Sequence, residues 1–238
     1  MEIMSLNEIS PDQVILWQLG FIKITVTLLY TWLVMLILVG GSWLVTRNVT
    51  SSVHITRWQN LLEVIVGTIR NQIWEISQDD PAHYIAFIGG LFLFIGLSNV
   101  LIIFPGYIAP TSSLNTTAAL AISVFFSVPL YGVTRRGIKG YLSEYFQPTF
   151  IFFPFHVLGE ITRTLALSIR LFGNIMSHDK IIAILLAITP LFFPIIMHAL
   201  GLLIGLVQAY IFSILAMVYI ASVTQAHGEN HSQTHGVK

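Results

Sequence analysis

The chain has 238 residues, of which 55% are hydrophobic and 9% are charged, and its formal net charge is zero. With a mean hydropathy of +0.80, this composition is typical of a single-domain, all-α, multi-pass membrane protein and gives no sign of nucleic-acid binding. The absence of cysteine excludes a disulfide framework, thiolate chemistry and iron–sulfur sites.

The N-terminal third is predicted to contain one membrane span and one surface helix. Residues 24–45 are apolar and long enough to cross a bilayer. Residues 58–76 also repeat apolar side chains at helical spacing, but Glu63, Arg70 and Glu75 interrupt them. That pattern favours an amphipathic helix lying at the membrane interface.

Two further spans are expected at 82–104 and 118–134, and the loop that joins them is uncharged. Lysine and arginine concentrate in the loops 47–70 and 135–139, whereas the N-terminus has almost none. Because cytoplasmic loops are enriched in basic residues, we expect five spans, an outside N-terminus and a cytoplasmic C-terminus.

Two long apolar runs, 149–189 and 191–225, complete the membrane domain, and the prolines between them predict a turn. As one helix, the first run would be about 60 Å long, whereas the hydrocarbon core is only ~30 Å thick. It would have to lie roughly 60° from the membrane normal, although ordinary spans tilt by about 20°. We therefore predict a long, steeply tilted hairpin.

Arg170 interrupts the first of these runs near the expected membrane midplane. A guanidinium costs about 2.5–3.5 kcal/mol or more to place there, so Arg170 predicts a functional site. Symmetry about the turn sets Gln208 at the depth of Arg170 and Gly201 opposite His178. At 100° per residue, Asp179 points away from the helix stripe that carries Arg170. The stripe also includes His156, Glu160, Arg163, Asn174, Ser177 and His178.

Two segments give these residues a family resemblance. The segments Ser168-Ile-Arg-Leu-Phe-Gly-Asn174 and Gly205-Leu-Val-Gln-Ala-Tyr-Ile-Phe212 are similar to subunit a of F-type ATP synthases. The similarity extends back to about residue 80 through Asn99 and Pro105-Gly106. It implies a stator protein beside a rotating c-ring, with peripheral-stalk b subunits and lipid as further partners. It also implies a bacterial inner membrane rather than an organelle membrane.

The resemblance implies a non-catalytic subunit without cofactor or metal. Such a subunit passes ions, most simply protons, through two offset half-channels to a carboxylate of the c-ring, and so couples the ion gradient to ATP synthesis or hydrolysis. Arg170, Gln208 and Asn174 would form the rotor interface. The guanidinium would lower the pKa of the rotor acid and, because it stays protonated, would block a direct leak between the half-channels.

Polar side chains elsewhere are candidates for the two half-channels, since histidine and carboxylate groups exchange protons through water. The candidates for the outer half-channel are His178, Asp179, Asn99 and Asn115. The candidates for the inner half-channel are Glu160, His156 and Arg163. Two positions that are commonly acidic in the family are Ile102 and Ser113 here, and Lys180 follows Asp179. The outer path therefore departs from the usual pattern.

Most of these side chains also have a structural interpretation. Without the resemblance, Arg170 is as well explained by an ion pair or a carbonyl clamp inside the bundle. Gln208 can bond a backbone carbonyl and Asn174 can have a similar structural role. His178 can make a structural hydrogen bond, and Glu160 can pair with Arg163 or Thr164. Histidines recur every fourth residue in the tail 227–238, but its glycines and polar composition favour a flexible segment over a metal site.

Two other functions compete with the one that the resemblance implies. The main alternative is a secondary transporter or ion channel in which the arginine binds an anion. Such folds usually show inverted repeats and broken helices, and neither is evident in this sequence. A purely structural membrane scaffold is the third interpretation. The choice between H⁺ and Na⁺ depends on the carboxylate of the c-subunit, which belongs to another chain.

Overall fold

The computed structural model describes residues 15–19, 22–47, 57–104, 106–145, 153–188 and 193–225. Five helices in these segments are long and apolar enough to cross a membrane, which confirms the all-α, multi-pass class. A short antiparallel hairpin of β1 (Ile15–Leu19) and β2 (Ile22–Thr25) precedes them. The hairpin was not expected from the sequence, and it leads directly into the first helix.

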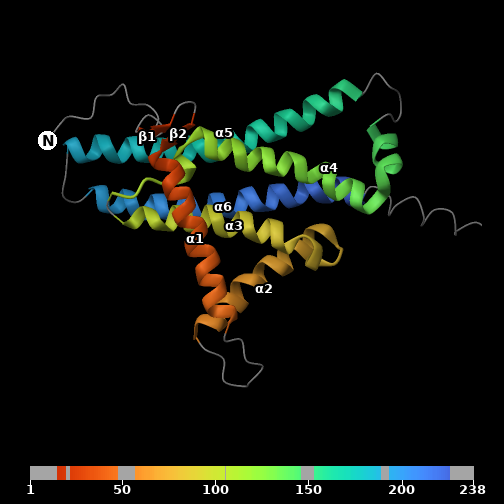
Figure 1. Cartoon of the computed structure of the whole chain (residues 1–238), viewed down its shortest axis with the longest axis horizontal. Helices are drawn as coiled ribbons and strands as arrows, with labels where there is room; N and C mark the ends of the chain where they lie inside the picture. Colours follow the sequence, from red (N-terminus) through yellow and green to blue (C-terminus); the bar gives the residue numbers. More distant parts are fainter. Residues whose placement is uncertain are drawn as a thin grey trace, which may run out of the picture.

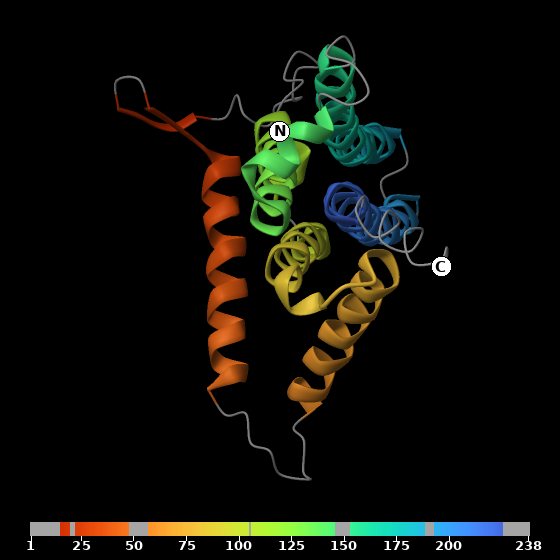
Figure 2. The same cartoon turned by 90° about the vertical axis from the view of Figure 1, so that its right-hand side faces the viewer.

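The first helix lies across the others. In Figure 1, α1 (Val26–Thr46) runs from top to bottom, whereas α3 (Ile85–Val100), α4 (Leu114–Tyr145), α5 (Phe153–Ile188) and α6 (Phe193–Gln225) run lengthwise. Figure 2 looks along these lengthwise helices and shows them packed as one bundle with α1 at its side. The apolar core of the chain therefore lies mainly where α3, α4, α5 and α6 meet.

The helix α4 is longer than the span expected at 118–134 and changes direction near its end. Gly137 has φ 72° and ψ 162°, a conformation that breaks the helical path. Glycine adopts positive φ at little cost because it has no Cβ. The α4 backbone therefore leaves the bundle direction soon after Arg135, where the apolar part of the helix ends.

The last two helices have the lengths that the hairpin prediction requires. The helix α5 has 36 residues and α6 has 33, which correspond to about 54 Å and about 50 Å at 1.5 Å per residue. Pro190 and the turn lie outside the described residues. The core side chains of the pair include Leu167, Leu171, Ala209, Phe212 and Ala216, all less than 2% exposed.

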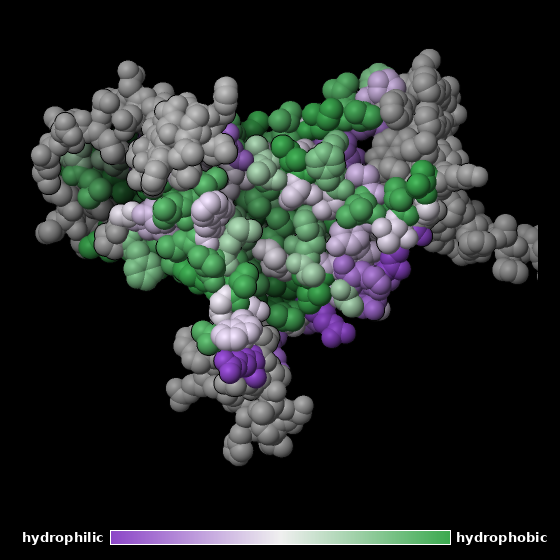
Figure 3. All heavy atoms as spheres, viewed as in Figure 1, coloured by the Kyte–Doolittle hydropathy of each residue, from purple (hydrophilic) through white to green (hydrophobic). Residues whose placement is uncertain are grey.

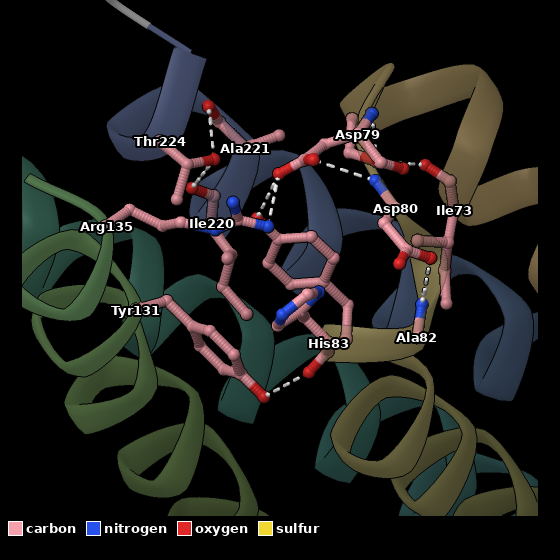
Figure 4. Close-up of polar contacts among 12 residues, drawn as sticks. Ile73, Asp79, Asp80, Ala82, His83, Tyr131, Arg135, Ile220, Ala221 and Thr224 are labelled. Atoms are coloured by element: carbon pink, nitrogen blue, oxygen red, sulfur yellow. Dashed lines mark hydrogen bonds and ion pairs between the residues drawn. The ribbon is translucent and has the colours of Figure 1, made fainter.

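The helix α2 (Arg57–Ser77) packs against α6, and the connection that follows it makes polar contacts with α4. Arg135 and Asp79 form an ion pair (Figure 4), in which Arg135 Nη2 lies 2.6 Å from Asp79 Oδ2. The Tyr84 hydroxyl donates a hydrogen bond to the same carboxylate oxygen at 3.2 Å. The Tyr131 hydroxyl donates to the His83 carbonyl at 3.2 Å. These contacts hold the α2–α3 connection, which contains the short turn η2 (Pro81–His83), beside the end of the α4 span.

Hydrophobic side chains cover the middle of the bundle, whereas hydrophilic ones gather at the lower end of α1 and at the right-hand end in Figure 3. Trp32, Leu36, Phe126, Ile169 and Leu203 are among the exposed apolar side chains. An exposed apolar belt of this kind is stable only against lipid or another apolar surface. The tail 227–238, with its histidines, lies outside the described residues.

Candidate functional site

Arg170 lies on the face of α5 that is not packed against the other helices, and its side chain is exposed. No hydrogen bond, ion pair or ring contact holds its guanidinium within the described part of the chain. Its neighbour Ile169 is 61% exposed, so the charge emerges among apolar side chains. An unpaired guanidinium is costly in an apolar surrounding. The internal ion pair or carbonyl clamp considered above is therefore absent among these residues, and the charge is available to a group on another molecule.

Two amides meet one helical turn from Arg170. Asn174 Nδ2 donates to Gln208 Oε1 at 2.7 Å, and Gln208 is only 3% exposed. Gln208 Nε2 is buried without a hydrogen-bond partner in the described chain. The sequence symmetry predicts that Gln208 lies at the depth of Arg170. The hydrogen bond of its side chain goes to Asn174, four residues further along α5.

His178 lies against α6, as the sequence symmetry predicted. Its imidazole occupies the space beside Gly201, where a Cβ would collide with three of the ring atoms. The ring of His198 lies 6.4 Å from that of His178, centroid to centroid, at an interplanar angle of 78°. His198 is not among the site residues predicted from the sequence. The available signal was its position on the same predicted helix, three residues before Gly201.

Asp179 is half-buried on α5, next to the buried His178. The ammonium of Lys180 is close enough to interact electrostatically with the Asp179 carboxylate. Lys180 itself is exposed, whereas Asp179 is half-buried. The pair therefore combines an ammonium that faces solvent or lipid with a carboxylate that is partly enclosed.

Asn99 is completely buried and joins three elements. Its Nδ2 donates to the Gly205 carbonyl of α6 at 2.9 Å, and its Oδ1 accepts from the Thr111 hydroxyl of η4 (Pro110–Ser112) at 2.8 Å. These bonds make Asn99 a bridge between helices. Asn115, by contrast, is exposed near the start of α4. At the two positions that are commonly acidic in the family, Ser113 is buried and Ile102 is half-buried.

The three candidates for the inner half-channel line one cavity. It has a volume of about 280 Å³ and lies between the first turns of α5 and the end of α6. His156, Glu160 and Arg163 all contribute to its wall, together with Phe155, Gly159, Ser222 and Val223. The Arg163 guanidinium lies over the Tyr219 ring at 5.5 Å, which holds it against α6.

The polar groups therefore form three sets along α5. Glu160 and Arg163 mark the cavity near its beginning, Arg170 follows, and His178 and Asp179 lie closer to its end. At 1.5 Å per residue, Arg170 is about 15 Å from Glu160 and about 12 Å from His178 along the helix. This arrangement supports two polar regions separated by one fixed positive charge.

Comparison with known proteins gives a consistent result. Residues 28–221 match the family described as ATP synthase A chain. The chain is 54% identical over 224 residues to "ATP synthase subunit a 1" of Chlorobaculum parvum, covering 94% of this chain and 99% of that protein. It is 55% identical over 223 residues to "ATP synthase subunit a 2" of Acaryochloris marina, covering 94% and 95%, respectively. It is also 54% identical over 222 residues to "ATP synthase subunit a" of Nitrosospira multiformis, covering 93% and 88%.

The matched residues 28–221 cover nearly the whole membrane bundle. They include α5, which carries the three polar sets. The chain belongs to the ATP synthase A chain family.

Proposed function

We propose that this protein is the membrane stator subunit of an ATP synthase and moves ions, most simply protons, through two offset half-channels beside a rotating c-ring. It makes and breaks no covalent bond other than those to the transferred protons. The single observation that carries the proposal is the exposed Arg170, which has no partner among the described residues and lies between two polar regions of α5. Family membership supports the same function.

The proposed role of Arg170 is electrostatic. A carboxylate of the rotor passing α5 would be stabilised in its charged form by the guanidinium, and its pKa would fall. The rotor carboxylate would release its ion before it passed Arg170 and would bind another ion after it had passed. Because arginine stays protonated in proteins, Arg170 cannot relay protons between the two polar regions. It therefore separates them.

The two half-channels are assigned from the neighbouring polar sets. His156, Glu160 and Arg163 would line the inner path, where the cavity of about 280 Å³ offers room for water. His178 and Asp179 would carry protons on the outer side, and Asn99 and Asn115 belong to the wall of that vestibule. Gln208 and Asn174 would position α6 against α5 at the rotor interface. The N-terminus would lie outside and the C-terminus in the cytoplasm of a bacterium.

The test compares Arg170→Ala with Arg170→Lys in assembled complexes. Lysine keeps the charge but loses the planar group with five donors, whereas alanine loses both. Both variants should abolish ATP synthesis driven by a proton gradient, and Arg170→Ala should also let protons leak passively. Proton uptake into energised vesicles and the membrane content of the subunit are measured together. Near-normal ATP synthesis by a fully assembled Arg170→Ala complex contradicts the proposal.

Co-purification distinguishes the rival functions. A stator subunit should purify with a rotor ring whose subunits carry a membrane-embedded carboxylate. An anion transporter or a scaffold would purify without it, and for a transporter Arg170→Ala should abolish substrate binding rather than cause a proton leak.

A further inference from the structure

His198 and His178 form a pair of imidazoles between α6 and α5. Their ring centroids lie 6.4 Å apart and the rings are nearly perpendicular. The pair exists because residue 201 is glycine: a side chain there would occupy the place of the His178 ring. The two histidines therefore face each other across the helix contact at the turn end of the hairpin.

The two rings differ in their surroundings. His198 is exposed, whereas His178 is only 7% exposed and its Nε2 is fully buried without a hydrogen-bond partner in the described residues. A buried polar nitrogen left without a partner is costly, so such a group normally has a water molecule or a functional reason. The pair thus connects the surface of the hairpin to a polar nitrogen in its interior.

We propose that His198 is a second proton-transfer residue of the outer half-channel, exchanging protons between the outside and His178. The inference rests on the function proposed above. A proton arrives at one ring nitrogen of neutral His198 and another leaves from its second nitrogen, and His178 repeats the exchange. A water molecule between the rings, whose centroids lie 6.4 Å apart, would carry the proton from one imidazole to the other. Only N–H and O–H bonds are formed and broken, and no oxidant or co-reactant is needed.

Among the described residues of α3, α4, α5 and α6, few other ionisable groups occur at this end of the hairpin. On α5, Asp179 and Lys180 follow His178, and α6 carries no Asp, Glu, Lys or Arg. The chain between Tyr84 and Thr134, which includes α3, η4 and most of α4, contains no Asp, Glu, Lys, Arg or His. Tyr107 lies in that stretch, and burial raises its pKa, so its hydroxyl stays protonated. His178, His198, Asp179 and Lys180 are therefore the ionisable side chains at this end of α5 and α6.

The test uses His198→Gln in complete complexes in sealed vesicles, with Ile196→Gln as the matched control. Ile196 is 50% exposed on the same helix and points about 160° away from His198. Proton-driven ATP synthesis is measured while the pH on the outer side is varied from about 6 to about 9, on either side of the ordinary imidazole pKa. We expect His198→Gln to lose roughly ten-fold in rate above about pH 7.5, where free protons are scarce, and little near pH 6.

Chemical rescue separates proton transfer from packing. Imidazole added to the outer side should restore the rate of His198→Ala, because it replaces the lost proton carrier without restoring a side-chain contact. The inference is overturned if His198→Gln follows the pH profile of Ile196→Gln, or if imidazole leaves His198→Ala slow. Arg170→Ala decides the underlying function independently. If it stops synthesis while His198→Gln behaves like the control, only the role of His198 fails.

Discussion

Arg170 differs from two other basic residues of the membrane helices in what surrounds its charge. Arg135 pairs with Asp79 at 2.6 Å, and Arg163 stacks over Tyr219 at 5.5 Å. Arg170 has neither kind of partner within the described chain and lies beside exposed apolar residues. The sequence could place the charge in the apolar run but could not show whether the fold would pair it. The missing partner supports the proposal that a group on another subunit meets this charge.

Asp179 provides a test of the outer half-channel at the level of a single side chain. Asp179→Asn preserves the size and polarity of the residue but removes its ability to accept a proton. We expect proton-driven ATP synthesis to fall by roughly ten-fold or more, with the assembled complex still present in the membrane. Ser177→Asn, which introduces the same amide at an exposed neighbour, is the control. Unchanged synthesis by Asp179→Asn would assign the carboxylate a structural role.

Contacts between elements depend on small residues at two places on α6. Gly201 accepts the His178 ring from α5, and Gly205 lies against Asn99 of α3. Small residues are favoured at helix contacts in membranes because they let the backbones approach closely. In both cases the space is used by a polar side chain. Both polar groups are therefore positioned by the packing of the helices, and Asn99 is held in addition by Thr111 of η4.

Gly205→Ala tests the contact between α3 and α6. The added Cβ would lie 2.7 Å from the Cβ of Asn99. Both atoms are fixed to the backbone, so the helices would have to separate and the Asn99–Gly205 hydrogen bond would weaken. We expect a loss of about 1–3 kcal/mol in stability, measured by thermal denaturation of the purified complex. Gly90→Ala in α3, where nothing lies within 4 Å, should have little effect; equal losses would argue against the contact.

At the scale of the whole molecule, the direction of α1 relative to α5 and α6 bears on the membrane orientation. The helix α1 has 21 residues, about 31 Å, which is close to the thickness of the hydrocarbon core. It crosses the direction of the two long helices in Figure 1. If α1 spans the bilayer in the ordinary way, α5 and α6 must lie strongly inclined. Their length and their apolar surface favour the same arrangement.

The inclination can be measured because the chain has no cysteine. Single cysteines at Leu158 and Ile184, which are 61% and 54% exposed, would carry a fluorophore on the surface of α5. These positions are about 39 Å apart along the helix. At a tilt of roughly 60° their depths differ by about 20 Å, and both labels stay in the ~30 Å core. At about 20° they differ by about 37 Å and at least one label reaches water. Depth-dependent quenching in reconstituted complexes distinguishes the two.

Several features of the fold could be read from the sequence because they depend on local composition. Uninterrupted apolar runs predict membrane helices whatever surrounds them, and the five membrane-length helices are confirmed. The β1–β2 hairpin was missed because no element was predicted before the span at 24–45. The extension of α4 to Tyr145 was also missed, since its last part is too polar to be recognised by hydropathy.

The sequence by itself determined the membrane class, the family resemblance, the position of Arg170 within an apolar run and the pairing of His178 with Gly201. Only the tertiary structure decided that Asn174 bonds to Gln208, that His198 faces His178 and that Asn99 bridges α3 to α6. These contacts depend on how far each helix is rotated about its own axis and on where α6 begins after the turn. Both are set by packing between helices distant in sequence, a property that no single helix encodes.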